Sequence, residues 1–165
     1  MSSRPRIKIG LQAVDRLIEI TGLVALFLMI ILPLVYMNEL PDEVPRHFNL
    51  SGEPDAFTGK EIIWLNPLLG MILWAALTLV NRYPHMFSYP VRVTEENAGR
   101  LYRLATRTLR ILKTLLMTLF LYLTISIIWI GLGRATTLSG ASILCFLILI
   151  LLLTGVMIWK MIRNR

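Results

Sequence analysis

The amino-acid sequence predicts an all-α membrane protein with four transmembrane helices, a compact irregular outer loop and a basic amphipathic helix on the cytoplasmic side. Hydrophobic residues make up 56% of the 165 residues and charged residues only 16%, whereas an average soluble domain has about 25% charged residues. The uncharged stretches form four runs, each near the ~20 residues that cross about 30 Å of hydrocarbon. We therefore expect a single membrane domain over residues 1–165, with spans at about 17–37, 62–81, 111–132 and 138–159.

The first apolar run follows Arg4, Arg6 and Lys8, an arrangement that also begins a secretory signal peptide. The run is longer than the roughly 7 to 15 apolar residues of a signal peptide. It ends near Pro33 without a small-residue cleavage pattern. We therefore interpret it as an uncleaved first helix.

The positions of lysine and arginine predict the orientation, because positively charged loops resist translocation. All but three of the seventeen precede the first span, lie between the second span and the first turn of the third, or follow the fourth. The exceptions are Arg46, Lys60 and Arg134. Both termini and the inner loop 82–110 are therefore predicted in the cytoplasm, and the outer loop 38–61 on the opposite side.

The outer loop combines chain-breaking residues with apolar ones. Pro41, Pro45 and Pro54 exclude a long helix, while Phe48 and Phe57 offer side chains to bury. We expect a compact, irregular cap on the outer membrane face.

His47 shares this loop with several carboxylates, which suggests a metal site. Zinc, however, usually takes three or four protein ligands at characteristic spacing, and a single histidine among scattered carboxylates lacks that spacing. We predict no metal and no other cofactor, and we expect His47 to hydrogen-bond backbone groups that the turns leave unpaired. A metal-dependent activity centred on His47 is the weaker alternative.

The inner loop differs in kind from the outer one. Thr94, followed by Glu95 and Glu96, predicts a helix start, and the helix is expected to run straight into the third span. Its apolar face is neighboured by an arginine stripe that we expect to contact lipid, because anionic lipid attracts each basic residue by about 1 kcal/mol. Docking of a cytosolic protein and a solvated face are the alternatives. The stripe consists of Arg100, Arg103, Arg107 and Arg110.

Two of the polar residues within the predicted spans invite a functional reading. Asn66 precedes Pro67 near the outer end of the second span and is expected to bridge helices or bind a freed carbonyl. Glu19 lies one turn from Asp15, and we expect a solvated carboxylate at the interface, with a proton relay as the alternative.

The outer loop also resembles a known family. The string from Leu40 to Lys60, followed by Asn66 and Pro67, resembles a widespread bacterial membrane domain of unknown function, and the likeness covers roughly residues 32–69. That domain also forms the N-terminal part of immunity proteins of the SdpI type, which protect cells from a secreted killing factor and can recruit a cytosolic repressor. The resemblance implies a protein of the bacterial cytoplasmic (inner) membrane and gives no catalytic residues. Its ligand or partner loop would contain His47, Phe48, Asn49, Gly52, Pro54, Asp55, Phe57 and Lys60.

These observations predict a non-enzymatic membrane protein. The spans contain no nucleophile and base at catalytic spacing, and the basic residues flank apolar runs, so nucleic acid is not an expected partner. We expect an envelope-sensing, immunity-like or accessory role. The expected partners are membrane lipids, an extracytoplasmic peptide or another membrane protein, and a cytosolic protein. The alternative is a small transporter or channel subunit, in which the four helices pack through Gly70, Gly131, Gly140 and Gly155 and oligomerise around a pathway.

Overall fold

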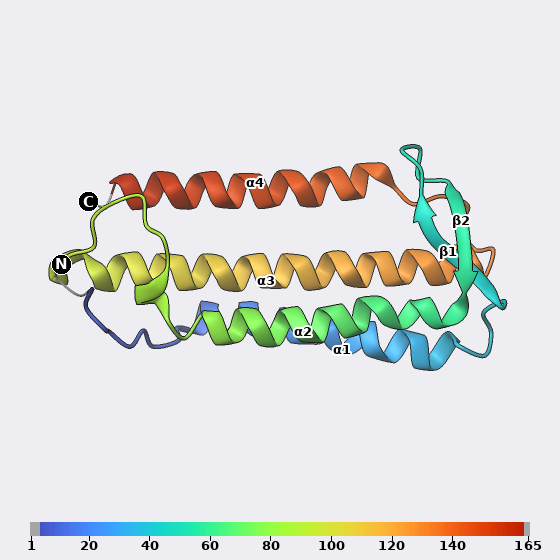
Figure 1. Cartoon of the computed structure of the whole chain (residues 1–165), viewed down its shortest axis with the longest axis horizontal. Coiled ribbons are helices and arrows are strands. Elements are labelled where there is room, and N and C mark those ends of the chain that lie inside the picture. The colour runs from blue at the N-terminus through green and yellow to red at the C-terminus, as the bar shows by residue number, and fades with distance from the viewer. Residues whose placement is uncertain (1–3, 164–165) are drawn as a thin grey trace.

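The computed structural model describes residues 4–163 and confirms a mostly helical chain. Within these residues, four helices are long and apolar enough to cross a membrane, counting the 3₁₀ turn η1 (Lys60–Trp64) with the helix that follows it. They lie side by side along the long axis (Figure 1), and we call the end that holds both termini the terminal end and the other the hairpin end. The helices are α1 (Ala13–Tyr36), α2 (Leu65–Val80), α3 (Glu95–Gly131) and α4 (Gly140–Arg163).

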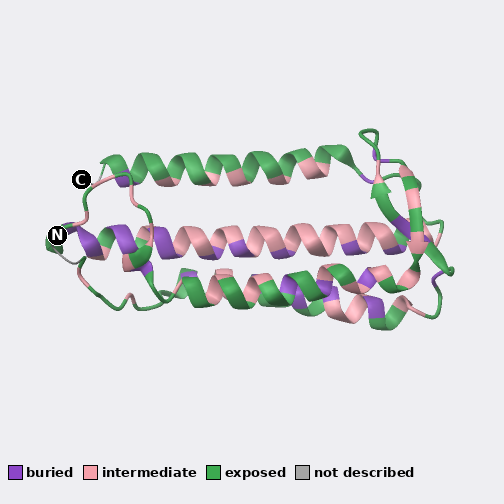
Figure 2. Ribbon diagram, in the orientation of Figure 1, coloured by how far each residue is buried: buried purple, intermediate pink, exposed green. Residues whose placement is uncertain are grey.

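The core lies between α1, α2 and α3. Leu26 and Met29 of α1 are buried against Met117 of α3, and α2 comes close at Gly70, where an added Cβ would stand 2.3 Å from Met29 Cε. In contrast, α4 packs chiefly on α3 and is exposed along almost its whole length (Figure 2). The helices α1, α2 and α3 therefore form the packed bundle, and α4 lies against its outside.

The four glycines that were expected to mediate helix packing divide into two groups. An added Cβ at Gly70 would meet Met29, and one at Gly131 would lie 3.0 Å from Leu40 Cδ2, so both glycines serve packing within the chain. An added Cβ at Gly155 would meet no atom within 4 Å, and one at Gly140 would lie 4.0 Å from the Leu50 backbone oxygen, so neither glycine is needed for close packing within the chain.

The longest helix, α3, contains 37 residues and is therefore about 56 Å long, which exceeds the ~30 Å of hydrocarbon. Its first turn is closed by a capping box, in which the Asn97 N–H donates to Thr94 Oγ1 and the Thr94 N–H donates to Asn97 Oδ1. The predicted start at Thr94 and the unbroken continuation into the third span are confirmed.

The predicted apolar face of α3 forms a second buried cluster at the terminal end. Leu101, Tyr102 and Ala105 are buried there with Met161 of α4. The loop before α3 contains the 3₁₀ turn η2 (Pro84–Met86) and covers this cluster. The Tyr89 hydroxyl donates to the Pro84 carbonyl at 2.8 Å, and burial raises its pKa above the usual value.

The prediction of an irregular outer loop is wrong, and the chain is therefore not all-α. Residues of this loop form an antiparallel hairpin of β1 (Glu43–Phe48) and β2 (Pro54–Gly59). Proline is tolerated in sheets at a strand's first residue or beside a bulge. Pro54 is the first residue of β2, and the pairing register shifts just after Pro45. The chain-breaking residues therefore occupy the places where a strand accepts them.

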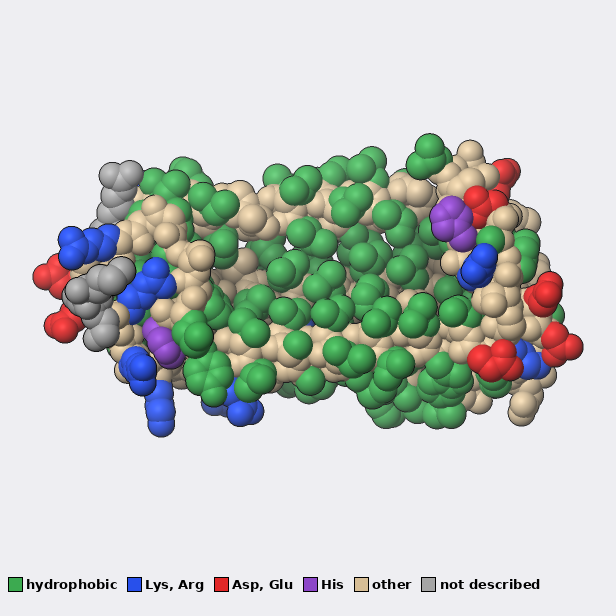
Figure 3. Space-filling view, in the orientation of Figure 1, with side chains coloured by type: hydrophobic (Ala, Val, Ile, Leu, Met, Phe, Trp, Pro, Cys, Tyr) green, Lys and Arg blue, Asp and Glu red, His purple; other side chains and the backbone are tan. Residues whose placement is uncertain are grey.

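Charge is concentrated at the two ends of the molecule. Lysine and arginine side chains gather at the terminal end, while acidic side chains are prominent at the hairpin end, and the surface between them is largely hydrophobic (Figure 3). This is the distribution expected of a protein that spans a bilayer.

Candidate functional site

The turn of the hairpin is organised by Asn49. Its side-chain Oδ1 accepts the N–H groups of Ser51 and Glu53 at 2.9 and 3.0 Å, and its Nδ2 donates to the Glu53 carboxylate at 3.1 Å. Gly52 has a φ of 80°, a conformation that glycine adopts without steric penalty. Asn49 and Gly52 therefore shape the turn.

The hairpin is anchored to the helices at two places. The Leu138 N–H, in the loop between α3 and α4, donates to the Gly52 carbonyl at 2.7 Å, and a Cβ added to Gly52 would lie 1.9 Å from the Leu138 oxygen. At the base of the hairpin, Val44 is buried with Ile63 and Ile128. The hairpin is thus held on the end of the bundle.

The outward residues of the hairpin form a mixed apolar and ionic surface. Leu50 at the tip is fully exposed and Phe57 is 53% exposed. His47 was expected to hydrogen-bond backbone groups. Instead, its Nδ1 lies 2.5 Å from Asp55 Oδ1, so this histidine pairs with a carboxylate. We call Leu50, Phe57, His47 and Asp55 the hairpin surface.

The remaining predicted loop residues are less exposed than the hairpin surface. Phe48 and Pro54 are half-buried, and Lys60 Nζ lies 3.2 Å from Asp42 Oδ1 at the start of the hairpin. Within residues 4–163, no three histidine, cysteine, aspartate or glutamate side chains stand close enough together to hold a metal ion.

An ionic cluster joins α1 to α3 near the terminal end. Arg107 Nε lies 2.7 Å from Asp15 Oδ1, and Arg110 Nε lies 3.4 Å from Glu19 Oε1. Asp15 also accepts the Gln12 backbone N–H at 2.9 Å. Glu19 therefore lies in an interhelical ion-pair cluster, which differs from the solvated carboxylate that was expected.

Lys113 extends this cluster into the bundle interior. Its side chain is 1% exposed, and its Nζ lies 2.8 Å from both Glu19 Oε2 and Thr78 Oγ1. The same Nζ stands 3.8 Å from the centre of the Trp74 ring, a distance at which the ring face attracts a cation. One ammonium group therefore joins α1, α2 and α3.

The role of Lys113 was not predicted from the sequence. The sequence does contain a signal for it, because acidic residues on one helix and basic residues on another recur at helical spacing. Asp15 and Glu19 stand four residues apart on one helix, while Arg107, Arg110 and Lys113 recur every three residues on another. Both spacings place their charges on one helix face, so complementary stripes are readable once the two helices are paired.

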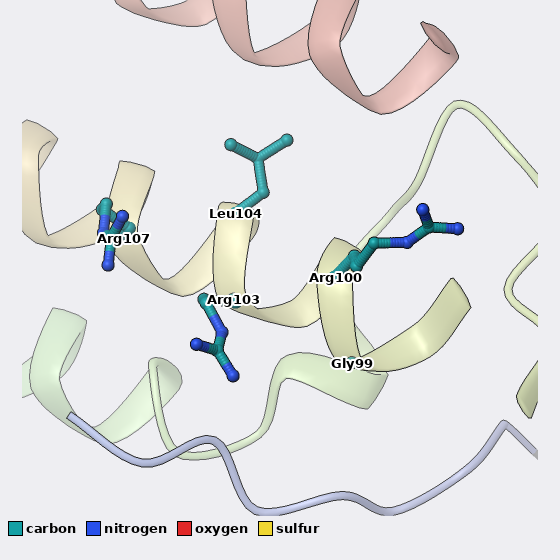
Figure 4. A pocket seen from close by; sticks show the side chains of 5 residues that line it. All are labelled: Gly99, Arg100, Arg103, Leu104 and Arg107. Carbon is teal, nitrogen blue, oxygen red and sulfur yellow. The ribbon is translucent and has the colours of Figure 1, made fainter. Parts of the chain in front are cut away.

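The predicted arginine stripe is divided by the structure. Arg110 is buried against the acids of α1 and Arg107 is half-buried beside it, so only Arg100 and Arg103 are freely exposed. A shallow hollow of 410 Å³ lies here, lined by Gly99, Arg100, Arg103, Leu104 and Arg107. Leu104 points toward α4 whereas Arg103 points away from it (Figure 4).

Asn66 bridges two helices. Its Nδ2 donates to Thr124 Oγ1 at 3.2 Å, and the Thr124 hydroxyl donates in turn to the Phe120 carbonyl. This polar pair lies between α2 and α3, so Asn66 has a packing role of the kind common between membrane helices.

Four apolar helices with charge gathered at both ends define a multi-pass membrane protein. Residues 24–71, which run from α1 through the hairpin into α2, match the family described as "Domain of unknown function (DUF1648)". An uncharacterized protein of Archaeoglobus fulgidus is 31% identical over 141 residues, which cover 79% of this chain and 75% of that protein. The chain belongs to the same family as this archaeal protein and carries the DUF1648 domain. No solved structure matches it.

Proposed function

We propose that the protein acts by binding and not by catalysis, in the bacterial cytoplasmic (inner) membrane, with both termini in the cytoplasm and the hairpin outside. The charge distribution supports this orientation, because lysine- and arginine-rich loops are retained in the cytoplasm. The ligand would be an extracytoplasmic peptide or another membrane protein.

The observation that carries this proposal is the hairpin surface on its fixed support. Apolar groups exposed on a held loop are typical of recognition sites, and here Leu50 and Phe57 project from a hairpin that is tied to Leu138 and to Ile128. The His47 and Asp55 pair beside them adds polar groups that can select a partner. The resemblance to SdpI-type proteins favours envelope sensing or immunity to a secreted peptide, and an accessory role beside another membrane protein uses the same surface.

On the opposite side, we propose that Arg100 and Arg103 contact membrane lipid or a cytosolic protein. The hollow beside them supports a lipid, because an arginine guanidinium group can bind a phosphate and Leu104, which also lines the hollow, offers an apolar contact to an acyl chain.

Photo-crosslinking in intact cells tests the outer part of the proposal. A photo-reactive residue at Phe57 is expected to capture the ligand, and one at Thr136, which is exposed at the same end but off the hairpin, is expected to capture none. A secreted peptide captured at Phe57 supports sensing or immunity, and a membrane protein supports an accessory role. Equal capture at both positions, or none at Phe57, would contradict recognition by the hairpin. A third position, at Arg103, identifies the inner contact.

A transporter or channel subunit is the second candidate, and the observation that favours it is the ion pair between buried Lys113 and half-buried Glu19. Ionisable groups inside a membrane often mark a pathway. Purified protein in liposomes is expected to show no ion flux above empty liposomes if binding is the function. Flux that is lost in a Lys113→Met variant would instead establish transport.

A further inference from the structure

We propose a second binding site, for a phosphate-bearing ligand, in a basic groove at the terminal end. This site is separate from the hairpin surface and from Arg100 and Arg103, and it does not depend on the proposed function. The groove has a volume of 530 Å³ and lies between the segment before α1, the residues after α2 and one face of α3. Its basic or titratable lining residues are Arg6, Lys8, Arg82, His85 and Arg110.

The groove carries positive charge that the chain does not neutralise. No carboxylate lines it, and Arg6, Lys8 and Arg82 form no ion pair with any described residue of 4–163. Arg110 pairs with Glu19 and lies 4.0 Å from Asp15 Oδ1, but Glu19 also binds Lys113 at 2.8 Å and Asp15 also binds Arg107 at 2.7 Å, so three basic side chains share two carboxylates. Like charges that converge in this way repel one another, and a bound anion removes that repulsion.

Hydrogen bonds fix the three walls of the groove to one another. Arg4 Nη1 donates to the carbonyls of His85 and Phe87 at 3.2 and 2.5 Å, which ties the N-terminal segment to the loop after α2. The Tyr102 hydroxyl donates to the Pro5 carbonyl at 3.0 Å, which ties the same segment to α3. The basic groups are therefore held near one another before any ligand arrives, a condition that favours binding.

The lining chemistry indicates the ligand class. Arginine presents paired donors that match phosphate geometry, and lysine binds phosphate as a point charge. The volume falls within the range of about 300 to 1,000 Å³ of small-molecule sites, and Ile7, Ile9 and Tyr83 give part of the wall an apolar character. The groove lies where α1 begins and α2 ends, at the headgroup level of a membrane that these helices cross. The phosphate could thus belong to an anionic lipid or to a soluble phosphorylated molecule.

The test uses full-length protein in nanodiscs and two matched variants. Arg6→Gln/Arg82→Gln removes two charges from the groove, and Arg16→Gln/Arg92→Gln removes two exposed charges that lie outside it. In one arm, native mass spectrometry measures retention of phosphatidylglycerol from mixed phosphatidylcholine nanodiscs. In the other, calorimetry measures inorganic phosphate and pyrophosphate binding in pure phosphatidylcholine, against chloride at equal ionic strength.

The groove variant is expected to bind about tenfold more weakly than wild type, because two charge-assisted hydrogen bonds are lost. The control variant is expected to change by less than about twofold, and both should keep the wild-type melting temperature, since all four side chains are exposed. An effect in the lipid arm alone identifies a lipid headgroup, and an effect with phosphate or pyrophosphate identifies a soluble ligand. Equal weakening in both variants, or no binding by wild type in either arm, would overturn the proposal.

Discussion

The ammonium group of Lys113 has a carboxylate, a hydroxyl and an aromatic ring around it. A buried charge is tolerated when it is paired and hydrogen-bonded, and it becomes destabilising when one partner is removed. Glu19 keeps part of its surface exposed and also binds Arg110. The two partners are therefore unequal, since Lys113 depends on Glu19 more than Glu19 depends on Lys113.

This inequality gives a prediction. Glu19→Gln leaves Lys113 buried without a counter-charge and is expected to lower the free energy of unfolding by about 2 to 3 kcal/mol. Lys113→Met should be milder, because Glu19 retains Arg110, and Glu19→Gln/Lys113→Met should recover much of the loss. Denaturant titration of protein in detergent micelles measures all three, with Arg16→Gln as the exposed control. A Glu19→Gln variant as stable as wild type would contradict the assigned pairing.

Gly52 gives a second prediction at the residue scale. Alanine there meets both a positive φ and the Leu138 oxygen, so Gly52→Ala is expected to free the hairpin from the loop between α3 and α4 at a cost of about 2 to 3 kcal/mol. Limited proteolysis should then cut within 43–59 faster than in wild type. Gly99→Ala is the control, because nothing lies within 4 Å of the added methyl and alanine favours the helix by about 1 kcal/mol. Unchanged cleavage in Gly52→Ala would show that the hairpin does not need this anchor.

At the scale of elements, two polar contacts join α2 to α3, one between Thr78 and Lys113 and the other between Asn66 and Thr124. A double-mutant cycle with Asn66→Ala and Thr124→Ala is expected to give a coupling energy of about 0.6 kcal/mol, the average for such bonds between membrane helices. Unfolding free energies of the wild type, the two single variants and the double variant provide the measurement. A coupling energy near zero would mean that Asn66 and Thr124 act independently.

The helices were predictable and the hairpin was not, for a physical reason. A membrane helix satisfies all its backbone groups locally, so an apolar run such as that of α4 is sufficient to predict it. The hairpin depends on pairing Val44 with Thr58, which lies fourteen positions further along the chain. Its prolines, taken with their immediate neighbours alone, predict turns and not strands. What stabilises β1 is contact with Ile128, which no local pattern contains.

The same reason explains which parts of the candidate site were predicted. Asn66 stands out as a polar residue in an apolar run, so its role between helices was readable. For Arg110 and Glu19 the sequence shows charges at a helix end, but which face meets another helix depends on the packing of α1 on α3. That packing turns Arg110 inward, so a stripe that looks uniform in sequence divides in the folded chain.

At the scale of the whole molecule, orientation is the property to measure. In a Cys145→Ser background, His47→Cys is expected to react with a membrane-impermeant maleimide in intact cells, because His47 is exposed on the hairpin. Arg100→Cys should react only after the cells are opened. The reverse pattern would place the terminal end outside and would overturn the proposed sidedness.

The uninterrupted course of α3 has a mechanical consequence. Near one end Ile128 packs against Val44 of the hairpin, and near the other Arg107 holds Asp15. A hydrogen-bonded helix resists compression along its axis, and helix shifts of 1 to 2 Å are a known means of switching. A displacement of the hairpin toward the bundle would therefore be transmitted along α3 to Arg107, because the helix has no break between these two contacts that could absorb it.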